Sequence, residues 1–232
     1  MNSMAQDQLL IRKSPKEITR DAELQCPPGT IFNQVPNFVS ASFQMQDPRR
    51  VADDFTVTSA PLSMRFWGME LDYETFNTCQ PSEMTFIIRF YERNLTDPTI
   101  PGDEVTSYTL SAIPEYFNVF LGGDFQVDVT FPEPVPVTDG WVSISRLNDG
   151  DPCYAFWHCE DMGGTGLGNT SVYMYFEEED QWRWQGAVPY ELELSMAFCL
   201  CGPRPPVPLK NWALVIGFVL IGTFIIIRYR RI

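Results

Sequence analysis

Residues 124–131 read DFQVDVTF, an alternation of apolar and polar side chains. The apolar members are Phe125, Val127, Val129 and Phe131, and the polar ones between them are Gln126, Asp128 and Thr130. Successive side chains of an extended chain point to opposite faces, so this pattern puts all the apolar ones on one face. The stretch therefore predicts a β-strand with one face in a core and the other face in water.

The same kind of pattern recurs on both sides of this stretch. Strand patterns cover residues 39–46, 51–57, 64–71, 85–92, 141–147, 171–176 and 192–200. Turn-forming clusters separate them, at residues 94–102, 121–124, 132–140, 148–152 and 163–169. Many short strands joined by such turns are typical of all-β domains. The sequence predicts an antiparallel β-sandwich with a jelly-roll-like arrangement.

The composition fits one substantial domain with an acidic surface. The chain has 232 residues, of which 44% are hydrophobic and 14% are aromatic, enough to build a large core. Its formal net charge is −14, and all 30 acidic residues precede Lys210, together with 12 of the 16 basic ones. An acidic surface repels phosphate backbones, so we expect no nucleic-acid partner.

The C-terminal end carries the pattern of a membrane anchor. Residues 212–227 read WALVIGFVLIGTFIII without a charge, and the apolar stretch extends over residues 209–229. As a helix, the longer stretch spans about 31 Å, close to the hydrocarbon thickness of a bilayer. The last five residues, RYRRI, include three arginines. By the positive-inside rule this end is expected in the cytoplasm and the preceding domain outside.

These features predict five parts. They are a flexible arm at 1–25, a β-sandwich ectodomain at 26–202, a proline-rich spacer at 203–208, a single transmembrane helix at 209–229 and a basic cytoplasmic tail at 230–232. Residues 1–25 contain no apolar run of signal-peptide length. Either the signal precedes this sequence, since Met4–Asp7 resembles the surroundings of a cleavage site, or the protein is tail-anchored with a cytoplasmic domain. The cysteines favour the first interpretation.

All six cysteines lie before the membrane segment, at Cys26, Cys79, Cys153, Cys159, Cys199 and Cys201. An even number in a membrane-tethered β domain predicts disulfides and an oxidising compartment. Cys153 and Cys159 enclose five residues, which are expected to form a short loop, and the two cysteines are the expected pair. On a strand, Cys199 and Cys201 share a face, and we expect them to reach Cys26 and Cys79 in an order left open. A competing zinc site of Cys153, His158 and Cys159 matches no common ligand spacing.

Charged side chains offer few sites for chemistry. Asp53 and Asp54 are neighbours in a strand pattern and must face opposite sides, so they cannot form a catalytic pair with each other. His158 is the only histidine, which argues against multi-histidine metal sites and favours a structural role. Weak calcium candidates occur in two acidic runs, with Asp149 and Asp151 in the first and Glu177 and Glu178 in the second. Solvated charge is the default for both, and we expect no metal and no cofactor.

Three tryptophans are the candidates for ligand contact. Trp182 and Trp184 lie two apart and share a face on a strand, while Trp157 lies in the segment between two cysteines. Exposed rings along a sheet suit stacking on sugar rings or contact with a partner protein. Packing inside the sandwich is the alternative.

The C-terminal layout resembles the tripartite sorting signals of bacterial surface proteins, the PEP-CTERM class and its relatives. The matching residues are Val207, Pro208, Leu209 and Trp212, followed by the apolar helix and by Arg228, Arg230 and Arg231. The Pro-Glu-Pro motif itself is missing, and the Val-Pro-Leu-x-x-Trp form is closer to signals built from a proline motif followed by tryptophan. The resemblance implies anchoring at the cell membrane and a sorting or processing enzyme as a partner.

The ectodomain is similar to uncharacterised secreted bacterial β-sandwich domains. The similarity lies in VADDFTV at 51–57, FWG at 66–68, FIIRFYE at 86–92, GWVSI at 140–144 and Ala197-Phe198. It implies location and fold but no chemistry. We therefore expect a non-catalytic, single-pass surface module with a structural or adhesive role that binds a glycan or a protein. The alternative is a secreted carbohydrate-active hydrolase with paired carboxylates on the same scaffold.

Overall fold

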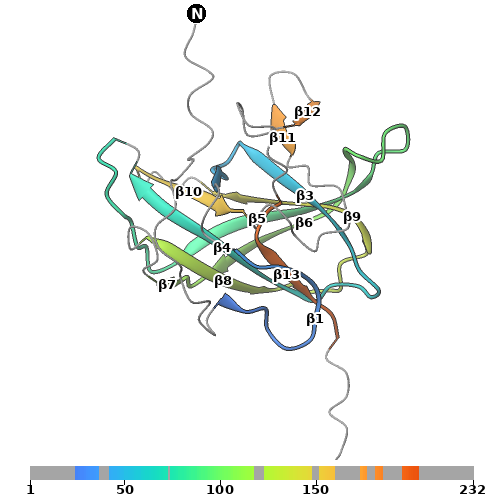
Figure 1. Cartoon of the computed structure of the whole chain (residues 1–232), viewed down its shortest axis with the longest axis horizontal. Helices are drawn as coiled ribbons and strands as arrows, with labels where there is room; N and C mark the ends of the chain where they lie inside the picture. The colour runs from blue at the N-terminus through green and yellow to red at the C-terminus, as the bar shows by residue number, and fades with distance from the viewer. Residues whose placement is uncertain are drawn as a thin grey trace, which may run out of the picture.

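The computed structural model describes residues 24–36, 42–72, 74–117, 123–147, 152–159, 173–176, 181–184 and 195–203 (Figure 1). Its elements are β1 (Thr30–Gln34), β2 (Ser42–Gln44), β3 (Arg50–Thr56), β4 (Ser63–Asp72), β5 (Met84–Arg93), β6 (Pro101–Ala112), β7 (Glu115–Phe117), β8 (Asp124–Thr130), β9 (Asp139–Arg146), β10 (Cys153–His158), β11 (Tyr173–Phe176), β12 (Gln181–Trp184) and β13 (Phe198–Cys201). Within the described residues every element is a strand, so the all-β prediction is confirmed.

The strands form two antiparallel sheets. In the six-stranded sheet the order is β12-β11-β3-β9-β5-β6. In the seven-stranded sheet β4 is central: β8 pairs along one edge of it, and β13 and β10 pair one after the other along its opposite edge. The outer neighbours are β1 beside β13, β2 beside β10 and β7 beside β8. Figure 1 shows these strands in two layers, with β11 and β12 projecting at one end.

The main core lies between the two sheets. The alternating stretch at 124–130 forms β8, and its apolar side chains Phe125, Val127 and Val129 are buried in this core as predicted. Aromatic rings meet across the layers: Phe66 of β4 and Phe86 of β5 pack edge to face, with ring centroids 5.0 Å apart. Such contacts between alternating inward side chains hold the two sheets together.

One ion pair is buried between the sheets. Glu70 of β4 and Arg146 at the end of β9 lie 2.7 Å apart, with side chains 0% and 1% exposed. The Arg146 guanidinium also donates to the Cys153 carbonyl oxygen at 2.9 Å. The charged groups compensate each other in a place where either one alone would be costly.

Three sequence predictions differ from the structure. The turn expected at 94–102 gives way at residue 101 to β6, a long polar edge strand that pairs with β5. The loop expected between Cys153 and Cys159 is strand β10, held between β4 and β2. The strand expected at 192–200 is a strand only from Phe198 onward, in β13, within the described residues.

The predicted membrane helix at 209–229, the predicted tail at 230–232 and residues 1–23 of the arm predicted at 1–25 lie outside the described residues. Among the residues that are described, no helix has the length and apolar character needed to cross a membrane.

Candidate functional site

Five aromatic side chains gather on the outer face of the six-stranded sheet. Val142 and Ile144 of β9 point into the core, so Trp141 points to the opposite face, as do Tyr91 on β5 and Tyr173 on β11. The aromatic cluster consists of Tyr91, Trp141, Tyr173, Tyr175 and Trp182. Strands far apart in the sequence contribute to it, because β11 pairs with β3 and β3 pairs with β9.

Trp182 is the member of the cluster that sequence reasoning singled out. Its ring packs edge to face on Tyr91 at 5.2 Å and against Tyr175 at 5.3 Å. Trp182, Tyr173 and Tyr175 remain partly exposed, whereas Tyr91 and Trp141 are buried beneath them. The guanidinium of Arg50 lies over the Tyr175 ring at 4.8 Å, which adds a cation–π contact at the border of the cluster. The rings are therefore fixed in place before any ligand arrives.

The buried floor of the cluster contains polar atoms. The Tyr91 hydroxyl lies 3.2 Å from the Ser143 hydroxyl, and burial raises the pKa of Tyr91, so the phenol stays neutral. The indole N–H of Trp141 is buried and has no hydrogen-bond partner among the residues that the structure describes. Trp141 packs edge to face on Tyr173 at 5.3 Å.

Charged groups lie beside the rings on the same face. Asp54 of β3 is paired with Trp141 on the neighbouring strand β9, and Trp141 is in turn paired with Tyr91 on β5. Arg93 bridges two carboxylates, donating to Asp54 at 3.0 Å and to Asp139 at 2.9 Å. Burial raises the pKa of Asp54 despite the bond from Arg93. Burial also opposes ionisation of Asp139, but hydrogen bonds from Thr56 and Arg93 outweigh it and lower its pKa.

The structure separates the three tryptophan candidates. Trp157 is fully buried in the main core, and its indole N–H donates to the Ala197 carbonyl oxygen at 2.9 Å. The prediction of Trp157 as a ligand contact is therefore wrong. It fails because β10 is a central strand whose odd-numbered residues, such as Ala155, face inward. The side chain of Trp184 lies outside the described residues, although its backbone belongs to strand β12.

Asp53 and Asp54 face opposite sides of β3, as the period of two requires. Asp53 is fully buried and accepts from the backbone N–H of Met196 at 2.6 Å and from that of Asp54 at 2.9 Å. A carboxylate bound to main-chain N–H groups in a core holds the chain together rather than reacting. The hydrolase alternative therefore needs a carboxylate pair other than Asp53 with Asp54.

Two disulfides are present, and one of the predicted pairings is wrong. The bonds join Cys26 to Cys199 and Cys79 to Cys153. The expected pair Cys153–Cys159 does not form because the residues between them are extended in β10. That puts their Cα atoms roughly 20 Å apart, far beyond disulfide range.

Cys26 was expected to bond to Cys199 or Cys201, and it bonds to Cys199. The partner of Cys79 is on β10 instead of β13. Cys159 and Cys201 are free and buried. The zinc alternative loses a ligand because Cys153 is oxidised. The two disulfides indicate that the domain belongs in an oxidising environment.

The calcium candidates Asp149, Asp151, Glu177 and Glu178 lie outside the described residues. Among the side chains that are described, no group of three or more histidine, cysteine, aspartate or glutamate residues is arranged to hold a metal ion.

His158 lies within hydrogen-bonding distance of Ser42 and Asp124, and the sequence did not indicate either contact. The Ser42 hydroxyl lies 2.7 Å from its Nδ1, and an Asp124 carboxylate oxygen lies 3.2 Å from its Nε2. Ser42 and His158 are directly opposite each other on β2 and β10, and all three residues are at most 5% exposed. The order of contacts resembles a nucleophile–base–acid relay, but burial keeps the serine from substrate. No local pattern signals this group, because the three residues are far apart in the sequence.

Comparison of the whole chain with known protein families, with curated proteins and with solved structures gives no match.

Proposed function

We propose that this protein is a non-catalytic surface module that binds carbohydrate through the aromatic cluster on the outer face of its six-stranded sheet. The observation that carries the proposal is the partly exposed ring of Trp182, which packs against Tyr175 and shares the cluster with partly exposed Tyr173. Flat rings held side by side provide apolar faces for the C–H groups of a sugar ring. An aromatic patch on a charged domain commonly marks an interaction surface.

The charges beside the rings support a carbohydrate ligand. Sugars present many hydroxyl groups, which both donate and accept hydrogen bonds. Asp54, Arg93 and Asp139 supply carboxylate acceptors and guanidinium donors beside the stacking surface. Rings and polar groups together fix both the position and the orientation of such a ligand.

The sequence supports a location at the cell membrane, which is part of the proposal. The apolar stretch at 209–229, the arginines after it and the motif beginning at Val207 favour an anchor in the cell membrane, with a sorting or processing enzyme as a partner. The two disulfides agree with a domain outside the cytoplasm. The jelly-roll-like connectivity and the resemblance to secreted bacterial β-sandwich domains belong to the same proposal.

Glycan-array screening of the detergent-solubilised full chain, followed by titration of the best ligand, tests the function. Trp182→Ala is expected to weaken binding at least about tenfold, since a central aromatic contact is worth roughly 2 kcal/mol or more. Tyr154→Ala is the matched control, because Tyr154 is an aromatic side chain 38% exposed on the other sheet. It is expected to bind like the wild type.

Two outcomes would overturn the proposal. Unchanged affinity of a folded Trp182→Ala variant would remove the cluster as the binding surface, and a complete absence of glycan binding would leave a protein ligand. Release of reducing sugar from a bound glycan would instead support the hydrolase alternative.

A further inference from the structure

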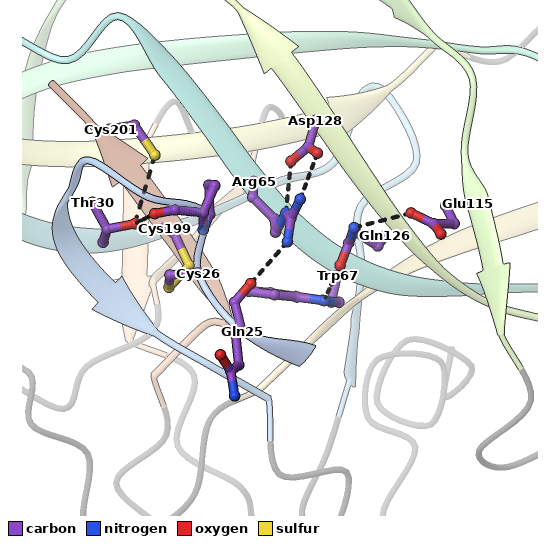
Figure 2. Close-up of polar contacts among 11 residues, drawn as sticks. Gln25, Cys26, Thr30, Arg65, Trp67, Glu115, Gln126, Asp128, Cys199 and Cys201 are labelled. Atoms are coloured by element: carbon purple, nitrogen blue, oxygen red, sulfur yellow. Dashed lines mark hydrogen bonds and ion pairs between the residues drawn. A yellow bond between two sulfur atoms is a disulfide. The ribbon is translucent and has the colours of Figure 1, made fainter. Parts of the chain in front are cut away.

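Three sulfur atoms gather on the outer face of the seven-stranded sheet, away from the aromatic cluster (Figure 2). Cys26 is bonded to Cys199 of β13, with Cα atoms 5.8 Å apart. Cys201 follows two residues later on the same strand, so its side chain lies on the same face as that of Cys199. The Cys201 thiol is free. A disulfide and an unoxidised thiol thus lie on the same face of β13, two residues apart.

The Thr30 hydroxyl connects this thiol to the segment that carries Cys26. Thr30 and Cys201 are directly opposite each other on β1 and β13. The hydroxyl donates to the Pro27 carbonyl oxygen at 2.6 Å and lies 3.7 Å from the Cys201 sulfur. Because the hydroxyl hydrogen is used by Pro27, the thiol is the donor in the second contact. The sulfur therefore lies next to the chain segment in which Cys26 directly precedes Pro27.

Arg65 places a positive charge in the same cluster. Arg65 lies on β4, directly opposite Cys199 of β13. Its Nε and Nη2 donate to the Asp128 carboxylate at 2.7 Å each, and its Nη1 donates to the Gln25 carbonyl oxygen at 2.8 Å (Figure 2). The hydrogen bond with Asp128 is the main cause of its raised pKa. A thiolate is the form that attacks a disulfide, and a neighbouring cation promotes that form.

We propose that Cys201 and Cys199 exchange as disulfide partners of Cys26. The Cys201 thiolate attacks the Cys26 sulfur, a Cys26–Cys201 bond forms, the Cys26–Cys199 bond breaks, and Cys199 leaves as a thiolate that takes up a proton. The step consumes no oxidant or reductant, because one disulfide and one thiol are present before and after it. A direct Cys199–Cys201 bond is disfavoured, since residues two apart on a strand are about 6.6 Å apart, near the upper limit for a disulfide.

The exchange gives the domain two positions at which the segment before β1 is fastened to β13. The crosslink is kept while its attachment point moves by two residues along the strand. The second free thiol, Cys159, has no such role. Burial and the negative charge of Asp53 raise its pKa well above the ordinary value, and its neighbour is the Met196 sulfur at 3.9 Å.

The full-length chain, produced with its disulfides formed, tests the proposal. In Cys199→Ser, non-reducing peptide mapping is expected to find a Cys26–Cys201 disulfide, and maleimide labelling after denaturation is expected to find Cys159 as the free thiol. In the control Cys199→Ser/Cys201→Ser, Cys26 becomes free, and in Cys159→Ser the Cys26–Cys199 bond is unchanged. A folded Cys199→Ser protein in which Cys26 and Cys201 both stay free would overturn the proposal.

A measurement on the wild type covers the case in which Cys199→Ser does not fold. The protein is incubated with a thiol-alkylating reagent, and fragmentation mass spectra locate the label on Cys199 or on Cys201. If the exchange occurs, some molecules carry the label on Cys199 and others carry it on Cys201. The rate of labelling at Cys199 is expected to fall severalfold in Arg65→Gln and to stay unchanged in Asp128→Asn. Label on Cys201 alone at every time point would overturn it.

Discussion

Asp53 and Asp54 are adjacent in the chain and have opposite surroundings. Asp53 faces the core and binds main-chain N–H groups of two segments. Asp54 faces outward beside the aromatic cluster and is held by Arg93. Side-chain alternation along β3 separates them, so the same residue type stabilises the core at one position and borders the proposed ligand surface at the next.

The raised pKa of Asp54 predicts a pH-dependent contribution to stability. Burial raises the pKa of this carboxyl above its ordinary value of 3.8, so the folded protein holds the proton more tightly than the unfolded chain. Its contribution to the free energy of unfolding is fully present below that ordinary value and is lost as the pH rises through the folded pKa.

Urea unfolding of the wild type and of Asp54→Asn across this pH range checks the sign. The stability of the wild type relative to the variant is expected to be greatest in acid, to fall as the pH rises past the ordinary pKa, and then to level off. A relative stability that increases with pH over the same window would contradict it.

At the scale of elements, β4 organises the seven-stranded sheet, because it pairs with β8 on one edge and with β13 and β10 on the other. Gly68 lies where β10 and β8 both approach this strand. A Cβ there would come within 2.5 Å of the Phe156 carbonyl oxygen and 2.7 Å of the Phe125 ring. The absence of a side chain at this position permits the close approach.

Gly68→Ala is therefore expected to destabilise the fold by about 1–3 kcal/mol, as other overpacked core positions do. The first obstruction is a main-chain carbonyl, which cannot move without disturbing the pairing of β10. Urea titration measures the effect, with Ser107→Ala on the exposed side of β6 as a control expected to change little. Equal stability of the two variants would show that β10 shifts freely.

At the scale of the whole molecule, two layers are held by a shared apolar core, two disulfides and the buried pair of Glu70 and Arg146. The ion pair links β4 in one sheet to β9 in the other. By contrast, the pair of Arg65 and Asp128 lies on the surface, with Asp128 57% exposed. Charge pairs in these two settings have different energetics, because only the buried one has lost its hydration.

Glu70→Ala is expected to lower the free energy of unfolding by about 3–5 kcal/mol, because it leaves Arg146 charged without its buried carboxylate partner. The double variant Glu70→Leu/Arg146→Met is expected to recover most of that loss, since neither charge then remains. Asp128→Ala is the surface control and is expected to cost at most about 1 kcal/mol. Calorimetric or denaturant unfolding compares them, and a double variant no more stable than Glu70→Ala would contradict this account.

Local patterns determined the fold class and several strands. The alternation in residues 124–131 predicted β8 and its buried face, and the pattern at 171–176 predicted a strand where β11 lies. These predictions succeed because alternation depends only on the geometry of an extended chain. The polar edge strand β6 was missed because an edge strand with one solvated face carries few apolar residues.

Pairings between distant segments were decided only by the tertiary structure. Cys79 bonds to Cys153 instead of Cys153 to Cys159 because β10 is extended between β4 and β2. Trp157 is in the core and Trp182 is on a surface because their strands occupy different sheets and present different faces. The partners of His158 likewise depend on register. Strand order and register bring together residues that no local spacing relates, so the sequence alone indicates many of the strands but not their neighbours.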